Sequence, residues 1–440
     1  MFKYLDKYEE GYPKVNDFVL LLFCGYVVIW YLQIGYRIPA LGAIRIEFVW
    51  ALVLIFIALF TKDKPNYLKN PLSGIVVLFF LSMLIQIPFS YVPDHSWNVF
   101  FNRVVKFAFM AFFIVSFVRS PKGLILFIGA FMLACMKMGQ EGFVGQLTGS
   151  MVWQNQGVMR LHGSTPNYLH PNSFSGMALG TIPFILYLFP LVPRWLKVVL
   201  AVQFVFACNI ILYTGSRTGY VAFFIMIFFW LLFSQKKILV SSILVVSILI
   251  GYQYIDEQYI ARFNTIFTGQ EIEGNSIGAR RQILDDAVDI FLEHPFGVGI
   301  SAFPAVRMSK FGRFQDTHNL YLEVATNLGF QGVVVFCIFI YSILKNLRRI
   351  YSNTTIRLNN LFLQLEHGGK VEVEKVKSIQ VVANLKLLSE LARAVSLFII
   401  IRLGLGLFGM DLYEIYWWFI LGLAISLNNI IFGVKKSINI

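Results

Sequence analysis

The chain has 440 residues, of which 57% are hydrophobic and only 14% are charged, and its formal net charge is +13. Apolar runs of about 20 residues recur along it, which is the length that crosses a bilayer core as a helix. This composition excludes a soluble globular protein. The positive charge does not indicate a nucleic-acid partner, because most of the basic residues fall in short connections between the apolar runs.

The polar N-terminal stretch is mixed in charge and lacks a small-residue cleavage site, so we expect no cleaved signal peptide before the first span. Backbone groups in lipid must be satisfied within their own segment, so each apolar run is predicted to be an α-helix. The predicted fold is all-α: a polytopic integral membrane protein with about 12 transmembrane helices and one large extracytoplasmic helical loop. The twelve predicted spans are 18–35, 41–60, 72–92, 103–118, 122–138, 171–190, 195–214, 218–234, 238–255, 326–344, 394–410 and 413–432.

Alternate connections between these spans are rich in Lys and Arg, whereas the short connections on the other side carry almost none. Cytoplasmic loops carry the excess of basic residues, so this pattern predicts that both termini are cytoplasmic. The basic residues concerned are Lys62, Lys64, Lys69, Arg119, Lys122, Arg194, Lys197, Lys236, Lys237, Lys345, Arg348, Arg349, Lys435 and Lys436.

This orientation divides the chain into three parts. Residues 1–255 are expected to hold transmembrane helices 1–9, residues 256–325 an extracytoplasmic loop with short helices, and residues 326–440 transmembrane helices 10–12. The last part contains a cytoplasmic connection, 346–392, whose apolar residues at helical spacing predict either an amphipathic helix on the inner leaflet or an ordinary linker helix. The 139–170 loop lies on the extracytoplasmic side, and whether it closes over a site stays open.

Ionisable groups inside spans are costly and usually mark function. Arg402 is the only one near the middle of a predicted span, and no Asp or Glu lies there. A coupled transporter usually needs such an acidic group, so this class is disfavoured. Arg402 is expected to pair with another residue, point into a cavity or bind a lipid phosphate. The four cysteines lie inside apolar runs and are expected to pack as small hydrophobes.

A cation occupies the very short connection TGSRTGY between two spans. Its position places Arg217 at the outer membrane surface, where Gly215 and Gly219 allow a turn or a close approach. Ser216 or Thr218 is suited to cap the next helix, whose N-terminus adds partial positive charge. Together these features predict an anion site suited to phosphate, although an interfacial arginine contacting lipid headgroups is the alternative.

The extracytoplasmic loop contains a predicted helix from Gly278 to Glu293. Arg280 and Arg281 fall in its first turn, where cations oppose the helix dipole, so a bound anion would explain them. Pairing of Arg281 with Asp285, four residues on, is the competing explanation. The apolar face is expected to consist of Ile283, Leu284, Ala287, Val288, Phe291 and Leu292.

A histidine begins the segment that leads into the tenth predicted span. His318 is therefore expected at the same membrane depth as Arg217, where an imidazole can take a proton from an attacking hydroxyl. A structural histidine is the alternative. His170 and Asn172, which open the sixth span, lie on the same side. No His, Glu or Asp spacing resembles a metal site, so neither a metal nor another cofactor is expected.

Four segments, taken in order, resemble the O-antigen ligase and O-antigen polymerase superfamily. They are HPNSFSG, GSRTGY, GARRQIL followed by EHPFGVGISAF, and THNLYLEVATNLGFQG. The resemblance covers residues 165–340 well, and the layout of spans extends it along the chain. It implies a GT-C-like membrane fold and a metal-independent, inverting glycosyltransferase of the bacterial inner membrane, with its active site facing the periplasm.

The resemblance also implies substrates and roles. The donor would be a glycan linked to undecaprenyl diphosphate, and the acceptor lipid A-core or another lipid-linked glycan, among membrane lipids. Arg217, Arg280 and His318 match the catalytic positions, although the adjacent Arg281 leaves the register of the arginine open. Leu284 stands where an aromatic residue is frequent. Arg281, Asn319, Asn172, His170 and Arg402 are expected to bind substrate.

Two alternatives remain open. A ligase and a polymerase share this chemistry, and the compact loop with HNLYLEVATNLGFQG favours the ligase. A flippase of lipid-linked glycans would also have many spans, but it predicts a charged central cavity and a pseudo-repeat between halves, and the sequence contains neither.

Overall fold

The computed structural model of the chain describes residues 12–61, 69–155, 157–234, 255–268, 276–367 and 372–437, with isolated positions between the first two and between the third and fourth ranges. This part of the chain is almost entirely helical. Its elements are α2 (Asp17–Leu32), α3 (Ile34–Arg37), α4 (Pro39–Ala43), α5 (Ile46–Phe60), α6 (Ser73–Leu84), α7 (Pro93–Val99), the π-helix η2 (Phe100–Val105), α8 (Lys106–Phe117), α9 (Pro121–Thr148), β1 (Val152–Asn155), β2 (Val158–Leu161), the 3₁₀ helix η3 (Pro166–Tyr168), α10 (Pro171–Leu188), α11 (Arg194–Tyr213), α12 (Arg217–Phe233), α14 (Glu257–Thr268), α15 (Ser276–Glu293), α16 (Phe303–Phe311), α17 (Leu320–His367), α18 (Glu372–Leu405) and α19 (Ile415–Ser437).

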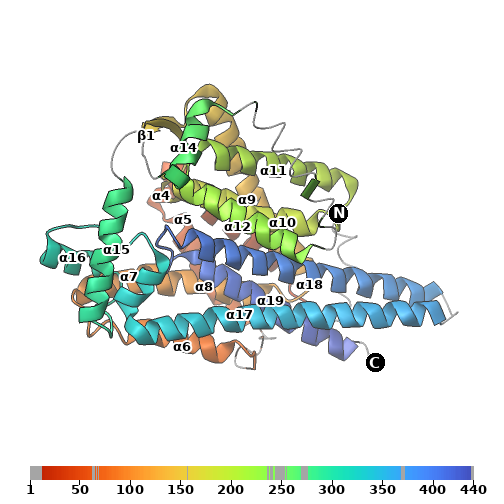
Figure 1. Cartoon of the computed structure of the whole chain (residues 1–440). Helices are drawn as coiled ribbons and strands as arrows, with labels where there is room; N and C mark the ends of the chain where they lie inside the picture. The colour runs from red at the N-terminus through yellow and green to blue at the C-terminus, as the bar shows by residue number, and fades with distance from the viewer. Residues whose placement is uncertain are drawn as a thin grey trace.

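The long helices form one bundle with their axes roughly aligned (Figure 1). Helix α17 packs along α18, α8 along α19, α2 along α9, and α10 lies between α11 and α18. Buried aromatic rings fill the centre of the bundle, where Phe131 lies 5.0 Å from Phe419 and 5.7 Å from Phe184, between ring centroids. Side chains on the outer faces are also apolar, as expected for helices that face lipid on one side.

Four helical segments of the described residues are long and apolar enough to cross a membrane: Pro93–Phe117, Pro121–Thr148, Arg194–Tyr213 and Leu320–Leu363. Shorter apolar helices lie beside them: Asp17–Leu32, Ile46–Phe60, Ser73–Leu84, Arg217–Phe233 and Ile415–Ile431. The prediction of a multi-pass helical membrane protein is thus supported, and the count of twelve stays a prediction. The predicted span 238–255 lies outside the described residues except for isolated positions.

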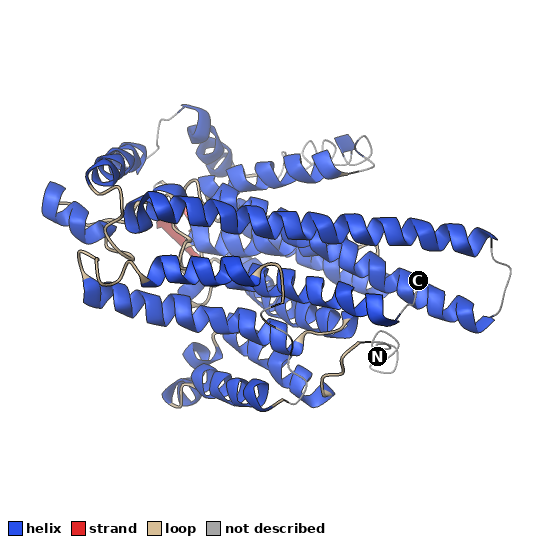
Figure 2. Cartoon of the chain, turned by 90° about the horizontal axis from the view of Figure 1, so that it is seen from below, coloured by secondary structure: helices blue, strands red, loops and turns tan. Residues whose placement is uncertain are grey.

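The prediction of a purely helical fold is wrong at one place. Strands β1 and β2 form an antiparallel hairpin inside the 139–170 loop, with Val152 paired to Leu161 and Trp153 to Arg160. In β2 Arg160 is buried, whereas its neighbour Met159 is exposed. Figure 2 shows this hairpin at the same end of the bundle as the short helices of the extracytoplasmic loop.

The connection predicted for residues 346–392 is a pair of long helices. Helix α17 runs on to His367, and α18 starts at Glu372, so the stretch expected as a separate amphipathic helix is the first part of α18. With a rise of about 1.5 Å per residue, α17 is far longer than a bilayer core requires. Figure 2 shows that the two helices extend together beyond the rest of the bundle, away from β1 and β2.

The eleventh predicted span ends earlier than expected. Helix α18 stops at Leu405, and residues 406–414 form a turn before α19 begins at Ile415. Three glycines at 404, 406 and 409 interrupt this stretch, and glycine is a poor residue for a helix interior. The turn lies at the end of the bundle that carries α15 and α16, and it contributes to the site described below.

Backbone contacts fix the segment between α15 and α17 on the bundle. Gly329 has a φ of 72° and a ψ of −173° inside α17, and a Cβ there would lie 2.3 Å from the carbonyl carbon of Phe296. The amide of Phe330 donates to the carbonyl of Pro295 at 2.8 Å, and that of Val298 donates to Thr326 at 2.9 Å. The chain after α15 is thereby held against the start of α17.

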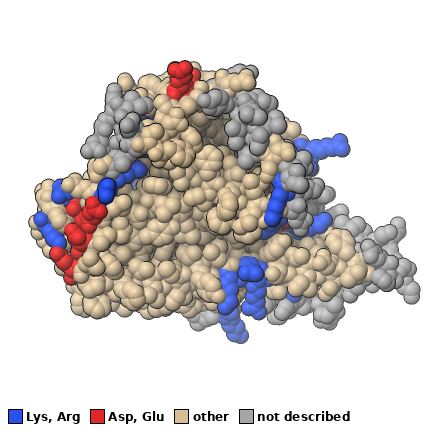
Figure 3. Space-filling model, viewed as in Figure 1, with Lys and Arg blue, Asp and Glu red and all other residues tan. Residues whose placement is uncertain are grey.

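Charges are distributed unevenly along the bundle. On the face drawn in Figure 3, a mixed group of acidic and basic side chains lies near α15 and α16, and a wide uncharged band follows. Beyond that band, towards the far end of α17 and α18, this face carries Lys and Arg only. An apolar band between charged ends is the pattern expected for a bundle that spans a bilayer.

Candidate functional site

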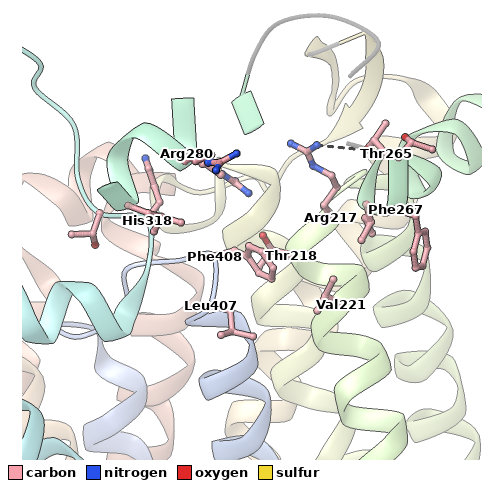
Figure 4. A pocket seen from close by; sticks show the side chains of 14 residues that line it. Arg217, Thr218, Val221, Thr265, Phe267, Arg280, His318, Leu407 and Phe408 are labelled. Atoms are coloured by element: carbon pink, nitrogen blue, oxygen red, sulfur yellow. Dashed lines mark hydrogen bonds between the residues drawn. The ribbon is translucent and has the colours of Figure 1, made fainter. Parts of the chain in front are cut away.

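A pocket of about 470 Å³ opens at the end of the bundle beside α14 and α15. Five separate segments build it: the start of α12, the end of α14, the first half of α15, the residues before α17 and the turn after α18. It brings together Arg217, Arg280, Arg281 and His318 (Figure 4). The structure thus gathers these four predicted residues, from positions up to 101 residues apart, around one space.

The turn before α12 has the local structure that its sequence predicts. Gly215 adopts a φ of 55°, and the hydroxyl of Ser216 caps α12 by accepting from the amide of Gly219 at 3.1 Å. A Cβ on Gly219 would lie 2.1 Å from Oγ of Ser175, so glycine is needed where α12 approaches α10. Arg217 is the first residue of α12, and its Nη1 donates to Oγ1 of Thr265 at 3.5 Å.

Helix α15 carries the second and third cations of the pocket. Arg280 is half-buried and Arg281 is exposed. The expected pair between Arg281 and Asp285 is absent, although both residues belong to the described part. Arg281 therefore lies near the start of α15 without this contact, which leaves the explanation by a bound anion in place.

The buried face of α15 differs from the prediction. Its most buried apolar residues are Ile283, Ala287 and Ile290, whereas Val288 and Leu292 are exposed. A salt bridge takes part in the packing on this side, because Nε of Arg307 donates to Oδ2 of Asp286 at 2.8 Å with both residues buried. Helices α16 and α17 thus pack on the covered face of α15.

His318 lies directly before α17 in an unusual backbone conformation. Its φ is 48°, in the left-handed region that non-glycine residues rarely adopt. The next residue holds this geometry, because Oδ1 of Asn319 accepts from the amides of Tyr321 and Leu322, both at 3.0 Å. Strained residues of this kind cluster at functional sites, where the surrounding structure keeps them in place.

The electrostatic surroundings keep the imidazole of His318 neutral. Burial lowers its pKa below the ordinary value, and the charges of Arg280 and Arg307 lower it further. A neutral imidazole is the form that accepts a proton. The same arginine side of the pocket that suits an anion thus also favours the basic form of His318.

The pocket has an apolar side as well. Figure 4 shows Val221 and Leu407 on the side towards the helices, with Arg217, Arg280 and His318 at its outer side. Phe267 and Phe408 add further apolar surface to the lining. A cavity with cations on one side and apolar groups on the side of the bundle matches a ligand that joins an anionic head to a lipid tail.

Asn319 and the residues that open α10 do not line the pocket. Asn319 caps α17, and its Nδ2 donates to the carbonyl of Leu407 at 3.1 Å. Nδ1 of His170 accepts from the amide of Asn172 at 3.2 Å. Oδ1 of Asn172 accepts from Nη2 of Arg160 at 2.9 Å and from the hydroxyl of Ser216 at 2.8 Å. These contacts are structural, and the expected substrate contacts of the three residues remain predictions.

His170 nevertheless lies within the electrostatic range of the pocket. Burial lowers its pKa, and the charges of Arg160, His318 and Arg280 contribute in the same direction. His170 thus belongs to the surroundings of the cationic side.

Arg402 is placed differently from the prediction of a substrate contact. Its side chain is buried and is absent from the pocket lining. It donates to the carbonyl of Gly176 at 3.1 Å, lies 3.3 Å from the ring centroid of Tyr416 and forms a 3.8 Å ion pair with Asp411. These internal partners compensate the charge of the cation, as the first of the three expectations for it required, while its buried Nε has no hydrogen-bond partner among the described residues.

Several residues of the site have no clear signal in the sequence. Arg160 and Arg262 are almost fully buried behind the turn of Arg217, and Leu407 and Phe408 come from a stretch predicted to be a span. The sequence signal for Arg160 is that it is a basic residue in the segment 139–170, which was predicted to be extracytoplasmic.

Within the described residues, no group of three or more His, Cys, Asp or Glu side chains is arranged to hold a metal ion.

Comparison with known families matches this region. The family model described as Wzy_C, O-antigen ligase, matches residues 202–337, from α11 into α17. The match contains Arg217, Arg280, Arg281 and His318, and it leaves Arg160 and the turn after α18 outside. No curated protein matches the chain. The family match confirms the predicted resemblance to the O-antigen ligase and O-antigen polymerase superfamily over residues 202–337.

Proposed function

We propose that this protein is an inverting, metal-independent glycosyltransferase that transfers a glycan from undecaprenyl diphosphate to the hydroxyl of an acceptor sugar. The observation that carries the proposal is the pocket in which Arg217, Arg280 and His318 meet above an apolar wall. A lipid-linked diphosphate has the matching parts, a strongly anionic head and an apolar tail. The family match supports this class of reaction.

In the proposed reaction the bond between the anomeric carbon and the diphosphate oxygen breaks, and negative charge on the leaving diphosphate increases. Arg217 and Arg280 would stabilise that charge, a contribution of about 3 kcal/mol for a well-placed donor. The half-buried site strengthens this effect, because charges interact more strongly away from bulk water. Two arginines also provide planar, bidentate donors for phosphate oxygens.

His318 would act as the general base. Its neutral imidazole takes the proton of the acceptor hydroxyl as the oxygen attacks the anomeric carbon from the side opposite the diphosphate. A single displacement of this kind inverts the anomeric carbon and requires no covalent enzyme intermediate. The lowered pKa of His318 supports the role, because the imidazole stays unprotonated at neutral pH.

The proposed location is the bacterial inner membrane, with the pocket facing the periplasm. The distribution of charge supports this orientation, since the described charged side chains beyond the uncharged band in Figure 3 are Lys and Arg. Cytosolic nucleotide sugars do not reach a pocket on the periplasmic side, so a lipid-borne donor fits it better.

Reconstitution tests the proposal. The purified protein is incorporated into vesicles with an undecaprenyl-diphosphate glycan and either lipid A-core or a second lipid-linked repeat unit, and the products are analysed by mass spectrometry. We expect transfer to lipid A-core, because the ligase is the favoured branch. Extension of the lipid-linked glycan instead would identify a polymerase, and no glycosidic product with any acceptor would contradict the proposal.

A further inference from the structure

A buried arginine from the β-hairpin contacts the turn that carries Arg217. Arg160 is only 4% exposed, and its Nε donates to the carbonyl of Thr214 at 2.8 Å. Its Nη2 donates to Oδ1 of Asn172, which in turn accepts from the hydroxyl that caps α12. One guanidinium therefore links the end of α11, the start of α10 and the cap of α12.

A second buried arginine contacts the next carbonyl of the same turn. Arg262, from α14, is 2% exposed, and its Nε donates to the carbonyl of Gly215 at 3.4 Å. Two guanidinium groups from different elements thus bind consecutive carbonyl groups, two and three residues before Arg217. Neither arginine lines the pocket.

The carbonyls of Thr214 and Gly215 lie at the C-terminal end of α11. They follow the last residue of α11, where unsatisfied carbonyl groups carry partial negative charge. Such a helix end repels an anion, yet it lies directly beside the first residue of α12, where the proposed diphosphate would bind. Arginine donors at both carbonyls satisfy these groups and replace the negative potential by a positive one.

The charges of the other three arginines of this region act on the pKa of Arg160. Burial lowers the pKa of Arg160 to about 10, and the charges of Arg262, Arg217 and Arg280 contribute. Arg160 stays protonated at neutral pH, so the folded protein holds several positive charges close together near the pocket, although they repel one another. An anion between them would relieve that repulsion.

We infer that Arg160 and Arg262 are positioning residues, which hold the turn of Arg217 and make the end of α11 compatible with a bound diphosphate. The inference rests on the proposed function and extends it to residues that do not contact the donor. We call Arg160 and Arg262, bound to the carbonyls of Thr214 and Gly215, the clamp. The β-hairpin of the 139–170 loop thereby has a role, because it carries Arg160. Asn172 and Ser216 take part in the clamp as hydrogen-bond partners.

The test measures binding of inorganic pyrophosphate to the purified full-length protein by calorimetry, alongside glycan transfer. We expect Arg160→Met to weaken pyrophosphate binding by about tenfold and to raise the KM for the donor, because the loss of two charge-assisted hydrogen bonds frees the turn. Arg160→Lys keeps the charge but lacks the fork, so it should restore part of the affinity. Arg194→Met, an exposed arginine at the opposite end of α11, is the matched control and should bind pyrophosphate as the unaltered protein does.

A double-mutant cycle separates positioning from an independent contact. If Arg160 acts through Arg217, the double variant Arg160→Met with Arg217→Ala binds pyrophosphate no more weakly than Arg217→Ala alone. Additive losses would mean that Arg160 acts on the anion independently of Arg217, and they would overturn its assignment as a residue that positions Arg217. The same cycle with Arg262→Met provides a second route if Arg160→Met does not fold.

The two failures are distinguishable. Full pyrophosphate affinity in folded Arg160→Met and Arg262→Met, with transfer by the unaltered protein intact, overturns the clamp and leaves the proposed function standing. A protein that binds pyrophosphate through these arginines but makes no glycosidic product supports the clamp and contradicts the proposed function. Absence of pyrophosphate binding by the unaltered protein overturns the clamp.

Discussion

The side chain of Asn319 donates to the carbonyl of Leu407 at 3.1 Å, and this bond joins the segment of His318 to the turn after α18. The backbone reinforces the link, because the amide of Leu320 donates to the carbonyl of Gly406 at 2.7 Å. His318 is thereby fixed from a part of the chain more than 80 residues away. The turn that fixes it also supplies Leu407 and Phe408 to the pocket.

Replacing the imidazole tests the general base. Asparagine tolerates a left-handed backbone better than most residues, so His318→Asn removes the base with little backbone strain. We expect glycan transfer to fall by about 10²- to 10⁴-fold in His318→Asn and in His318→Ala, with insertion and thermal stability of His318→Asn preserved. The exposed His95→Ala, outside the pocket lining, is the control and should retain activity. Undiminished transfer by both His318 variants would remove the base assignment.

The pH dependence of transfer follows from the lowered pKa of His318. Activity requires the neutral imidazole, so kcat/KM should fall as the pH drops through a pKa below the ordinary 6.5 of histidine. Arg280 is one cause of the lowered pKa, so Arg280→Gln should move this acidic limb to higher pH. A pH profile of kcat/KM for both proteins checks the direction. An acidic limb that stays in place would show that Arg280 does not act on His318.

We expect Arg280, rather than Arg281, to be the arginine of α15 that stabilises the leaving diphosphate. Arg280 is half-buried and acts on the pKa of both His318 and His170, whereas Arg281 is exposed. We expect Arg280→Ala to lower kcat/KM for the donor by about 100-fold and Arg281→Ala by less than tenfold, because charges in half-buried positions are less screened. Steady-state kinetics with the lipid-linked donor measures both. The reverse order would assign the role to Arg281.

Arg217 is expected to need its guanidinium shape as well as its charge. Arg217→Ala should reduce donor turnover strongly, and Arg217→Lys should restore only part of it, because an ammonium group cannot bind two phosphate oxygens in a planar, bidentate manner. Transfer rates at saturating and at low donor concentrations separate turnover from binding. Full activity in Arg217→Ala would take this residue out of the site.

The close approach of α10 and α12 predicts a steric effect. A Cβ at position 219 would lie 2.1 Å from Oγ of Ser175, so Gly219→Ala should separate the helices, displace Arg217 and cost about 1–3 kcal/mol of stability. Gly129→Ala is the control, since a Cβ there meets no atom within 4 Å. Thermal unfolding and transfer assays measure the two effects. Ser175→Ala in the Gly219→Ala background should restore part of both, and no restoration would contradict the steric cause.

Much of the site was predictable because local chemistry decides it. The sequence TGSRTGY predicted a turn at Gly215, a cap by Ser216 or Thr218 and a cation at the start of a helix; the structure has the turn, the cap by Ser216 and the cation. The stop of α15 before Pro295 was predictable for the same reason. Such features depend on residues within a few positions of one another.

Other features were missed because they depend on distant segments. The burial of Ile290 instead of Leu292 on α15 is set by packing against α16, which periodicity alone does not define. The sequence left open whether Arg402 pairs internally or binds a ligand, because its partners Gly176, Asp411 and Tyr416 come from other elements. The β-hairpin was missed because two four-residue strands carry too short a pattern to read.

The sequence by itself determined the membrane character of this protein, its resemblance to the O-antigen ligase and polymerase superfamily, and the choice of Arg217, Arg280 and His318 as candidates. Hydrophobicity, charge bias and turn residues act locally, so they can be read along the chain. Only the tertiary structure decided that these residues share one pocket with Leu407, and that Arg160 and Arg262 lie behind it. Long-range hydrogen bonds and helix packing set those relations, and they join residues whose separation in the chain carries no local signal.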